Sequence, residues 1–115
     1  MKAVIRWSKK QISIYIPKTM TTMKFNISSS GSLYTKFTAL INREILRDKY
    51  HASIELTDLI KLIMKDLKDR KPRSIRDTRL KALTALAHVL LVSSPNEFDE
   101  LFGIGETLSL IHISE

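Results

Sequence analysis

Residues 74–92 read SIRDTRLKALTALAHVLLV. Leucine and alanine recur in this stretch at intervals of three and four residues, which places one apolar stripe along a helix. The stripe consists of Leu80, Leu83, Leu86, Ala87, Leu90 and Leu91. Ser74, followed three residues later by Asp77, resembles a capping box, so we expect the helix to begin at Ser74. It is the strongest helical pattern in the chain.

Three further helices are expected on both sides of this stretch. Each has apolar residues at helical spacing and a Ser or Thr that can cap its start. Pro72 and Gly103 are natural stops for the helices that precede them. We expect these helices over residues 32–49, from residue 53 or 57 to 68, and over 95–102.

Two short strands are expected before the helices. Gln11–Ile16 alternates polar and apolar residues, and Pro17 would end the strand. Lys24–Ile27 is a second candidate. Four amphipathic helices must bury their apolar faces against one another. The predicted fold is therefore mainly α: a small cluster of about four helices with one or two short N-terminal strands.

The sequence predicts three segments. Residues 108–115 are the in-frame translation of CTG TCT CTT ATA CAC ATC TCC GAG, a sequence found at the ends of transposase-based sequencing libraries; the alternative is an ordinary apolar helix or strand end. Residues 23–107 form an incomplete helical domain. Residues 1–22 are either a basic N-terminal extension or translated upstream DNA, because Met20 and Met23 are alternative starts.

Several classes of function are disfavoured by composition. The chain has no cysteine, which excludes disulfides and thiolate chemistry. It has no secretory signal pattern and no apolar run of the roughly 20 residues that span a bilayer, so we predict a cytoplasmic protein without a membrane partner. Its histidines and paired carboxylates form no metal-binding or acid–base motif. We therefore predict that it is not an enzyme and that it binds no cofactor, metal or small molecule.

The net charge of +7 is concentrated in two segments. Residues 1–23 hold five cations and no acid, whereas residues 65–81 hold eight cations and three acids. The second segment spans the expected end of one helix and the start of the next, where several cations could contact phosphates of double-stranded DNA. Backbone N–H groups at the Ser74 helix start would add an anion site. The candidate contacts are Lys65, Lys68, Arg70, Lys71, Arg73, Arg76 and Arg79.

The alternative for residues 65–81 is a solvated face whose charge Asp66, Asp69 and Asp77 partly neutralise. No aromatic residue interrupts the run, which argues against base stacking with a single strand.

The stretch from Lys68 to Leu86, an arginine-rich turn leading into an Ala/Leu-rich helix, resembles the N-terminal part of RepA-type plasmid replication initiators. The resemblance covers about a fifth of the chain and includes no catalytic motif. It implies a DNA-binding initiator or regulator in which a winged-helix domain would follow.

A second reading is a small helical interaction or scaffold domain without a nucleic-acid partner. In that case apolar helix faces would support self-association or contact another region. The candidate face is formed by Phe98, Leu101 and Phe102.

Overall fold

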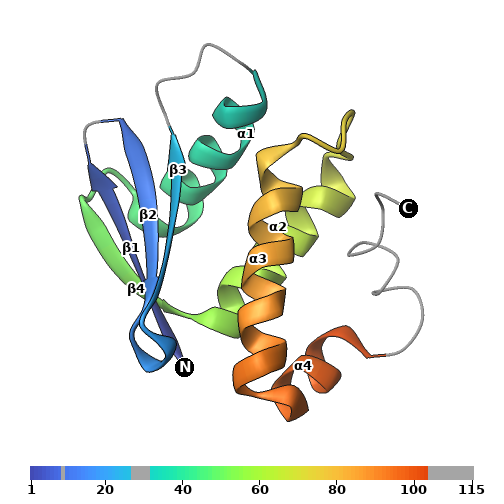
Figure 1. Cartoon of the computed structure of the whole chain (residues 1–115). Helices are drawn as coiled ribbons and strands as arrows, with labels where there is room; N and C mark the ends of the chain where they lie inside the picture. Colours follow the sequence, from blue (N-terminus) through green and yellow to red (C-terminus); the bar gives the residue numbers. More distant parts are fainter. Residues whose placement is uncertain (9, 27–31, 104–115) are drawn as a thin grey trace.

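The structure, a computed structural model, describes residues 1–8, 10–26 and 32–103, and for residues 32–36 the backbone alone. The elements in chain order are β1 (Lys2–Ser8), β2 (Gln11–Ile16), the 3₁₀ turn η1 (Pro17–Thr19), β3 (Thr21–Asn26), α1 (Ser32–Ile41), the π-helical turn η2 (Asn42–Leu46), β4 (His51–Glu55), α2 (Leu56–Asp69), α3 (Thr78–Ser93) and α4 (Pro95–Phe102) (Figure 1).

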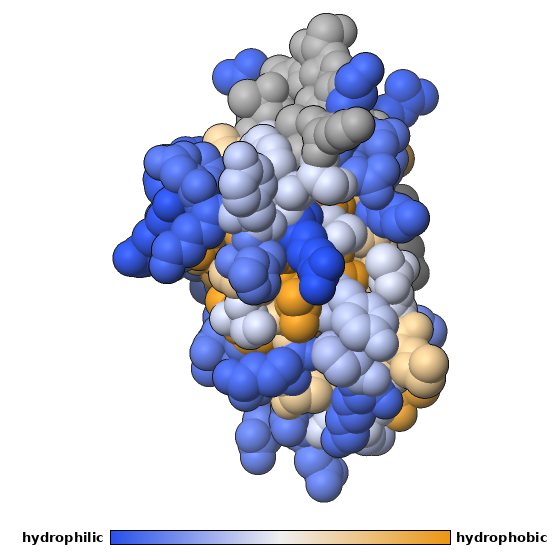
Figure 2. Space-filling model, turned by 90° about the vertical axis from the view of Figure 1, so that its left-hand side faces the viewer, coloured by the Kyte–Doolittle hydropathy of each residue, from blue (hydrophilic) through white to orange (hydrophobic). Residues whose placement is uncertain are grey.

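The described strands form one antiparallel sheet in the order β3-β2-β1-β4. Successive side chains of a strand point to opposite faces. In β2, Ile12, Ile14 and Ile16 are fully buried, whereas Ser13 and Tyr15 face the other way. The sheet therefore has one apolar face and one polar face. Figure 2 views the side of the molecule on which the strands lie, and hydrophilic residues cover most of it.

α1, α2 and α3 cover the apolar face of the sheet, so the molecule has two layers, and α4 packs against α2 and α3 (Figure 1). A single core joins the two layers. Ile5 of β1 and Phe37 of α1 belong to this core together with Leu59 and Ile63 of α2 and Leu83 of α3, and all five are fully buried.

Pro17 and Met20 determine the turn between β2 and β3. Pro17 has no N–H to donate to the sheet, so β2 ends before it and η1 begins. Met20 then adopts a left-handed conformation, with φ of 54°, and its N–H donates to the Pro17 carbonyl. This reversal lets β3 return alongside β2.

The first helical segment ends three residues earlier than the sequence predicts. Its last turn, η2, is π-helical and is closed by Arg47 and Asp48, whose φ angles are 51° and 69°. Asn42 stabilises this left-handed pair: its side-chain oxygen accepts from the Asp48 N–H at 3.0 Å, and its amide donates to the Asp48 carboxylate at 3.3 Å. The chain can then turn into β4.

The boundaries of the other helices follow local chemistry. α2 begins at Leu56 and ends at Asp69, close to its predicted range. α3 begins at Thr78 rather than Ser74, because the Asp77 side chain caps it by accepting from the Arg79 N–H at 2.9 Å. α4 begins at Pro95 and ends at Phe102; the next residue, Gly103, has a positive φ of 60°, which suits glycine.

The predicted mainly α fold is wrong: the described residues form an α+β fold with a four-stranded antiparallel sheet. β1 and β4 are absent from the predicted elements. In β1 the outward Val4 blurs the polar–apolar alternation. In β4 the inward residues are only Ala52 and Ile54, so the segment was interpreted as the start of a helix.

The predicted segment boundary at residues 22–23 falls inside β3, and the strands on both sides of it contribute to one core. Residues 108–115 lie outside the described residues, so their origin stays a prediction.

Ile14→Ala tests how far β2 contributes to the core. Ile14 is fully buried, so we expect the substitution to lower the free energy of unfolding by about 2–5 kcal/mol, measured by urea denaturation. Ser13→Ala, on the polar face of the same strand, should change it by less than about 0.5 kcal/mol. Equal, small effects at both positions would contradict this packing.

Candidate nucleic-acid interface

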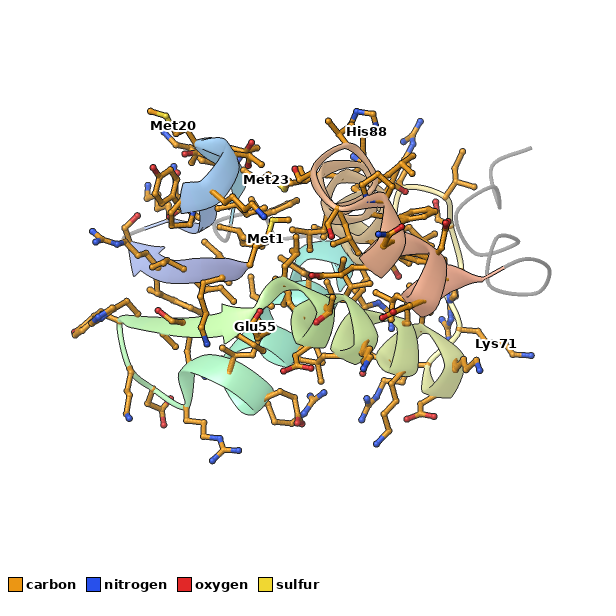
Figure 3. All side chains as sticks on the ribbon, turned by 90° about the horizontal axis from the view of Figure 1, so that it is seen from below. Met1, Met20, Met23, Glu55, Lys71 and His88 are labelled. Atoms are coloured by element: carbon orange, nitrogen blue, oxygen red, sulfur yellow. The ribbon has the colours of Figure 1, made fainter. Side chains whose placement is uncertain are left out.

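The connection between α2 and α3 carries most of the predicted phosphate contacts. It is a turn rather than a helix start: the Ser74 hydroxyl accepts from the Arg76 N–H at 3.1 Å, and the Asp77 N–H donates to the Ser74 carbonyl at 3.1 Å. Figure 3 shows Lys71 projecting from the end of the molecule that lies away from the strands.

Arg79 lies beneath this connection and is fully buried. Its guanidinium forms a two-point contact with Asp77, Nε to Oδ1 at 3.1 Å and Nη2 to Oδ2 at 2.7 Å. Nη1 donates to the Asp66 carboxylate at 2.7 Å and to the Asp66 carbonyl at 3.3 Å. Two acids on different elements are thus bridged by one planar cation, a geometry for which the arginine fork is suited.

Asp66 is shared among three arginines. Besides Arg79, Arg70 reaches it at 2.6 Å from the end of α2, and Arg43 reaches it at 3.5 Å from η2. The Asp66 side chain is only 7% exposed, whereas those of Arg43 and Arg70 remain 47% and 60% exposed. The carboxylate therefore joins η2, α2 and α3 at one point.

Hydrogen bonds to Asp77 raise the pKa of Arg79 above its ordinary value, with further support from Asp66, and they outweigh the opposing effect of burial. No buried side-chain nitrogen or oxygen of the described residues lacks a hydrogen-bond partner. A buried ionic group that is fully paired can be tolerated, but removing one partner leaves an uncompensated charge. We call Arg79, Asp66 and Asp77 the buried ionic cluster.

The seven predicted contact residues divide into two groups. Arg79 is enclosed in the buried ionic cluster and reaches no surface. The other six are exposed along the end of α2 and the following turn: Lys65, Lys68, Arg70, Lys71, Arg73 and Arg76. We call these six the basic edge.

The buried ionic cluster changes the charge balance of this region. Asp66 and Asp77 are 6% and 0% exposed and are turned towards Arg79. Among residues 65–81, Asp69 is the acid that remains exposed, against the basic edge and Lys81. Asp66 and Asp77 therefore neutralise Arg79 and Arg70, and they leave the other cations of the basic edge without an acidic partner among the residues that the structure describes.

The anion site predicted at the Ser74 helix start is wrong. The first N–H groups of α3 follow Asp77, and its carboxylate already accepts from the Arg79 N–H. A second anion at this position would meet a negative charge. Phosphate contact in this region must come from the side chains of the basic edge.

Two grooves near the helices are less suited to an anion. One, of about 630 Å³, lies between α2 and α4 and is lined by three carboxylates, Glu55, Glu97 and Glu100, with Lys61. The other, of about 140 Å³, contains Arg43 and Lys65 but also Glu44 and Asp69. Among the described residues, no group of three acids or histidines could hold a metal ion.

The apolar face predicted for self-association packs inside the chain. Phe102 is 2% exposed, Phe98 and Leu101 are partly buried against the core, and the Phe98 and Phe102 ring centroids are 4.6 Å apart. Self-association stays a prediction. Within the described range, none of the helices is long and apolar enough to cross a bilayer.

The chain matches no protein-family model, no curated protein and no solved structure. The resemblance to RepA-type initiators therefore stays a prediction, and so do the absence of catalysis and of a cofactor.

Arg79→Met tests the buried ionic cluster. It leaves Asp77 buried without its main cation, so we expect a loss of about 3–5 kcal/mol in the free energy of unfolding. Arg79→Lys should also destabilise, because one ammonium cannot reproduce the planar contact. Arg73→Met, at an exposed position, should cost less than about 0.5 kcal/mol. Equal effects of Arg79→Met and Arg73→Met in urea denaturation would contradict a structural role for Arg79.

Proposed function

We propose that the protein binds double-stranded DNA through the basic edge. The observation that carries this proposal is the separation of charge: the buried ionic cluster holds two acids inside, while six cations remain exposed on one end of the molecule. Within the described part of the chain, only Arg70 of these six forms an ion pair, with Asp66. The other five have their full charge available to phosphate oxygens.

The turn is well suited to holding these cations in place. It is fixed at one end by Arg70, whose N–H donates to the Asp66 carbonyl at 2.8 Å, and at the other by Asp77. A fixed surface loses less conformational entropy on binding than a flexible one. Contacts of this kind position a protein on DNA without reading its sequence.

Ile75 adds one apolar contact to the basic edge. It is 65% exposed and lies between Arg73 and Arg76 in the turn. Proteins that bind the minor groove commonly place an apolar side chain next to arginines, where it presses against a base step. In the proposed complex, Ile75 packs into the minor groove while its neighbours bind the flanking phosphates.

Removing two cations of the basic edge tests the proposal. We expect Arg73→Gln with Arg76→Gln to weaken binding to a fluorescein-labelled duplex by roughly 10- to 100-fold at about 0.1 M salt, and to lower the slope of log affinity against log salt by about 1.8. Fluorescence anisotropy at several salt concentrations measures both quantities.

The matched control is Lys49→Gln with Lys61→Gln, which removes the same charge from exposed positions outside the basic edge. It should leave affinity and salt slope close to those of the wild type. If both pairs weaken binding equally, only net charge matters and the basic edge is not the site. If the wild-type protein binds no duplex at low salt, the proposed function is wrong.

Ile75→Ser separates the apolar contact from the ionic ones. Because the substitution removes no charge, we expect lower affinity for the duplex at every salt concentration with an unchanged salt slope. Ile75→Leu should bind like the wild type. Unchanged affinity of Ile75→Ser would leave the phosphate contacts in place and exclude Ile75 from the interface.

A further inference from the structure

The polar face of the sheet carries a row of hydrophilic residues that crosses all four strands. His51 of β4 pairs with Arg6 of β1, Arg6 pairs with Ser13 of β2, and Ser13 pairs with Lys24 of β3. Neighbouring strands lie about 4.8 Å apart, so the Arg6 and Lys24 backbones are separated by roughly 10 Å. Arg6, Lys24 and His51 are all exposed.

This face is almost free of negative charge. Of the residues in the four strands, Glu55 alone is acidic. It is paired with the Met1 amine at 3.1 Å and with Lys2 at 3.3 Å, and these contacts hold the pKa of its carboxyl below the ordinary value. Arg6 and Lys24 form no ion pair with any other described residue. Their charges are therefore directed at solvent.

An aromatic ring lies beside the cationic row. Tyr15 follows Ser13 by two residues on β2, on the same face, and is 37% exposed. Its cross-strand neighbours are Val4 and Thr22, both of which have smaller side chains. The basic edge has no such ring. A phenol next to two unpaired cations matches the chemistry of an unpaired nucleotide, which offers an aromatic base and a phosphate.

We propose that the polar face of the sheet is a second binding surface, one that takes single-stranded nucleic acid by stacking a base on Tyr15 and binding phosphates with Arg6 and Lys24. The bases of a duplex are stacked inside it and cannot reach a ring lying on a sheet, so a duplex gains only the phosphate contacts here. The sheet and Lys71 of the basic edge lie at opposite ends of the molecule (Figures 1 and 3). The two surfaces can therefore be occupied independently.

The test measures binding of fluorescein-labelled oligo-deoxythymidine by anisotropy. We expect Arg6→Gln with Lys24→Gln to lower the salt slope by about 1.4, at about 0.7 for each lost phosphate contact on a single strand. Tyr15→Leu, which keeps an apolar side chain on the strand but removes the ring, should weaken binding about 5- to 150-fold. Tyr15→Phe should bind like the wild type, because the ring remains.

The pair Lys49→Gln with Lys61→Gln is the control, and it should retain oligo-deoxythymidine binding. Thermal unfolding of each variant shows whether it is folded. If Tyr15→Leu is unfolded, the test depends on Arg6→Gln with Lys24→Gln. Four results would overturn the inference: no binding by the wild type, no effect of the sheet pair beyond that of Lys49→Gln with Lys61→Gln, wild-type binding by a folded Tyr15→Leu, or binding of phosphatidylserine vesicles in place of the oligonucleotide.

The outcome is independent of the proposed duplex binding. One possible result is that only Arg73→Gln with Arg76→Gln loses duplex binding, while every sheet variant binds oligo-deoxythymidine like the wild type. That result supports the basic edge as a duplex-binding site and contradicts the proposed binding surface on the sheet. If instead the sheet variants lose oligo-deoxythymidine binding and Arg73→Gln with Arg76→Gln retains duplex binding, the sheet surface is supported and the basic edge is not the duplex-binding site.

Discussion

The contact of buried Arg79 with Asp77 and Asp66 is the constraint on which this end of the molecule depends. It joins the start of α3 to the end of α2, and Asp66 extends the connection to Arg43 of η2. Because it is buried, its strength is not screened by salt in the way that a surface pair is. It also determines which charges are exposed: Asp66 and Asp77 are buried together with Arg79, and the six cations of the basic edge remain at the surface.

The sheet obeys a related rule. Its core-facing positions are filled by apolar residues such as Ile5, Ile12 and Ile14, so the cations of the same strands must lie on the opposite face. An N-terminal segment rich in Lys and Arg and without acids thereby becomes a positive surface with a defined spacing. In both regions the packing of the core determines which charged side chains reach the surface. The proposed binding depends on these exposed charges.

Local patterns in the sequence predicted part of this structure. The alternation of Gln11–Ile16 and the stop at Pro17 correspond to β2 and η1, and the apolar stripes place α2, α3 and α4 close to their observed ranges. Helix formation depends on residues three and four apart, which a single sequence displays directly. The grouping of the six cations of the basic edge could likewise be predicted, because residues that are close in sequence at a helix end and in the following turn stay close in space.

The remaining features depend on residues far apart in the chain. β4 pairs with β1 across more than forty residues, and a five-residue strand with Ala52 and Ile54 as its inward side chains has too weak a pattern to be recognised alone. Arg79 looked like one more cation in a basic run. The spacing Asp77-x-Arg79 was a signal of pairing that could have been noticed, but the part played by Asp66 and Arg43 could not.

The central claim is that the turn above the buried ionic cluster is a phosphate-binding surface. The most direct measurement is a titration of the ¹⁵N-labelled protein with a short DNA duplex, followed by amide chemical shifts. We expect the largest changes in the amide shifts of residues 65–76, and we expect these changes to become smaller as salt is added. Changes confined to α4 and the groove beside it, or an unchanged spectrum at low salt, would contradict this claim.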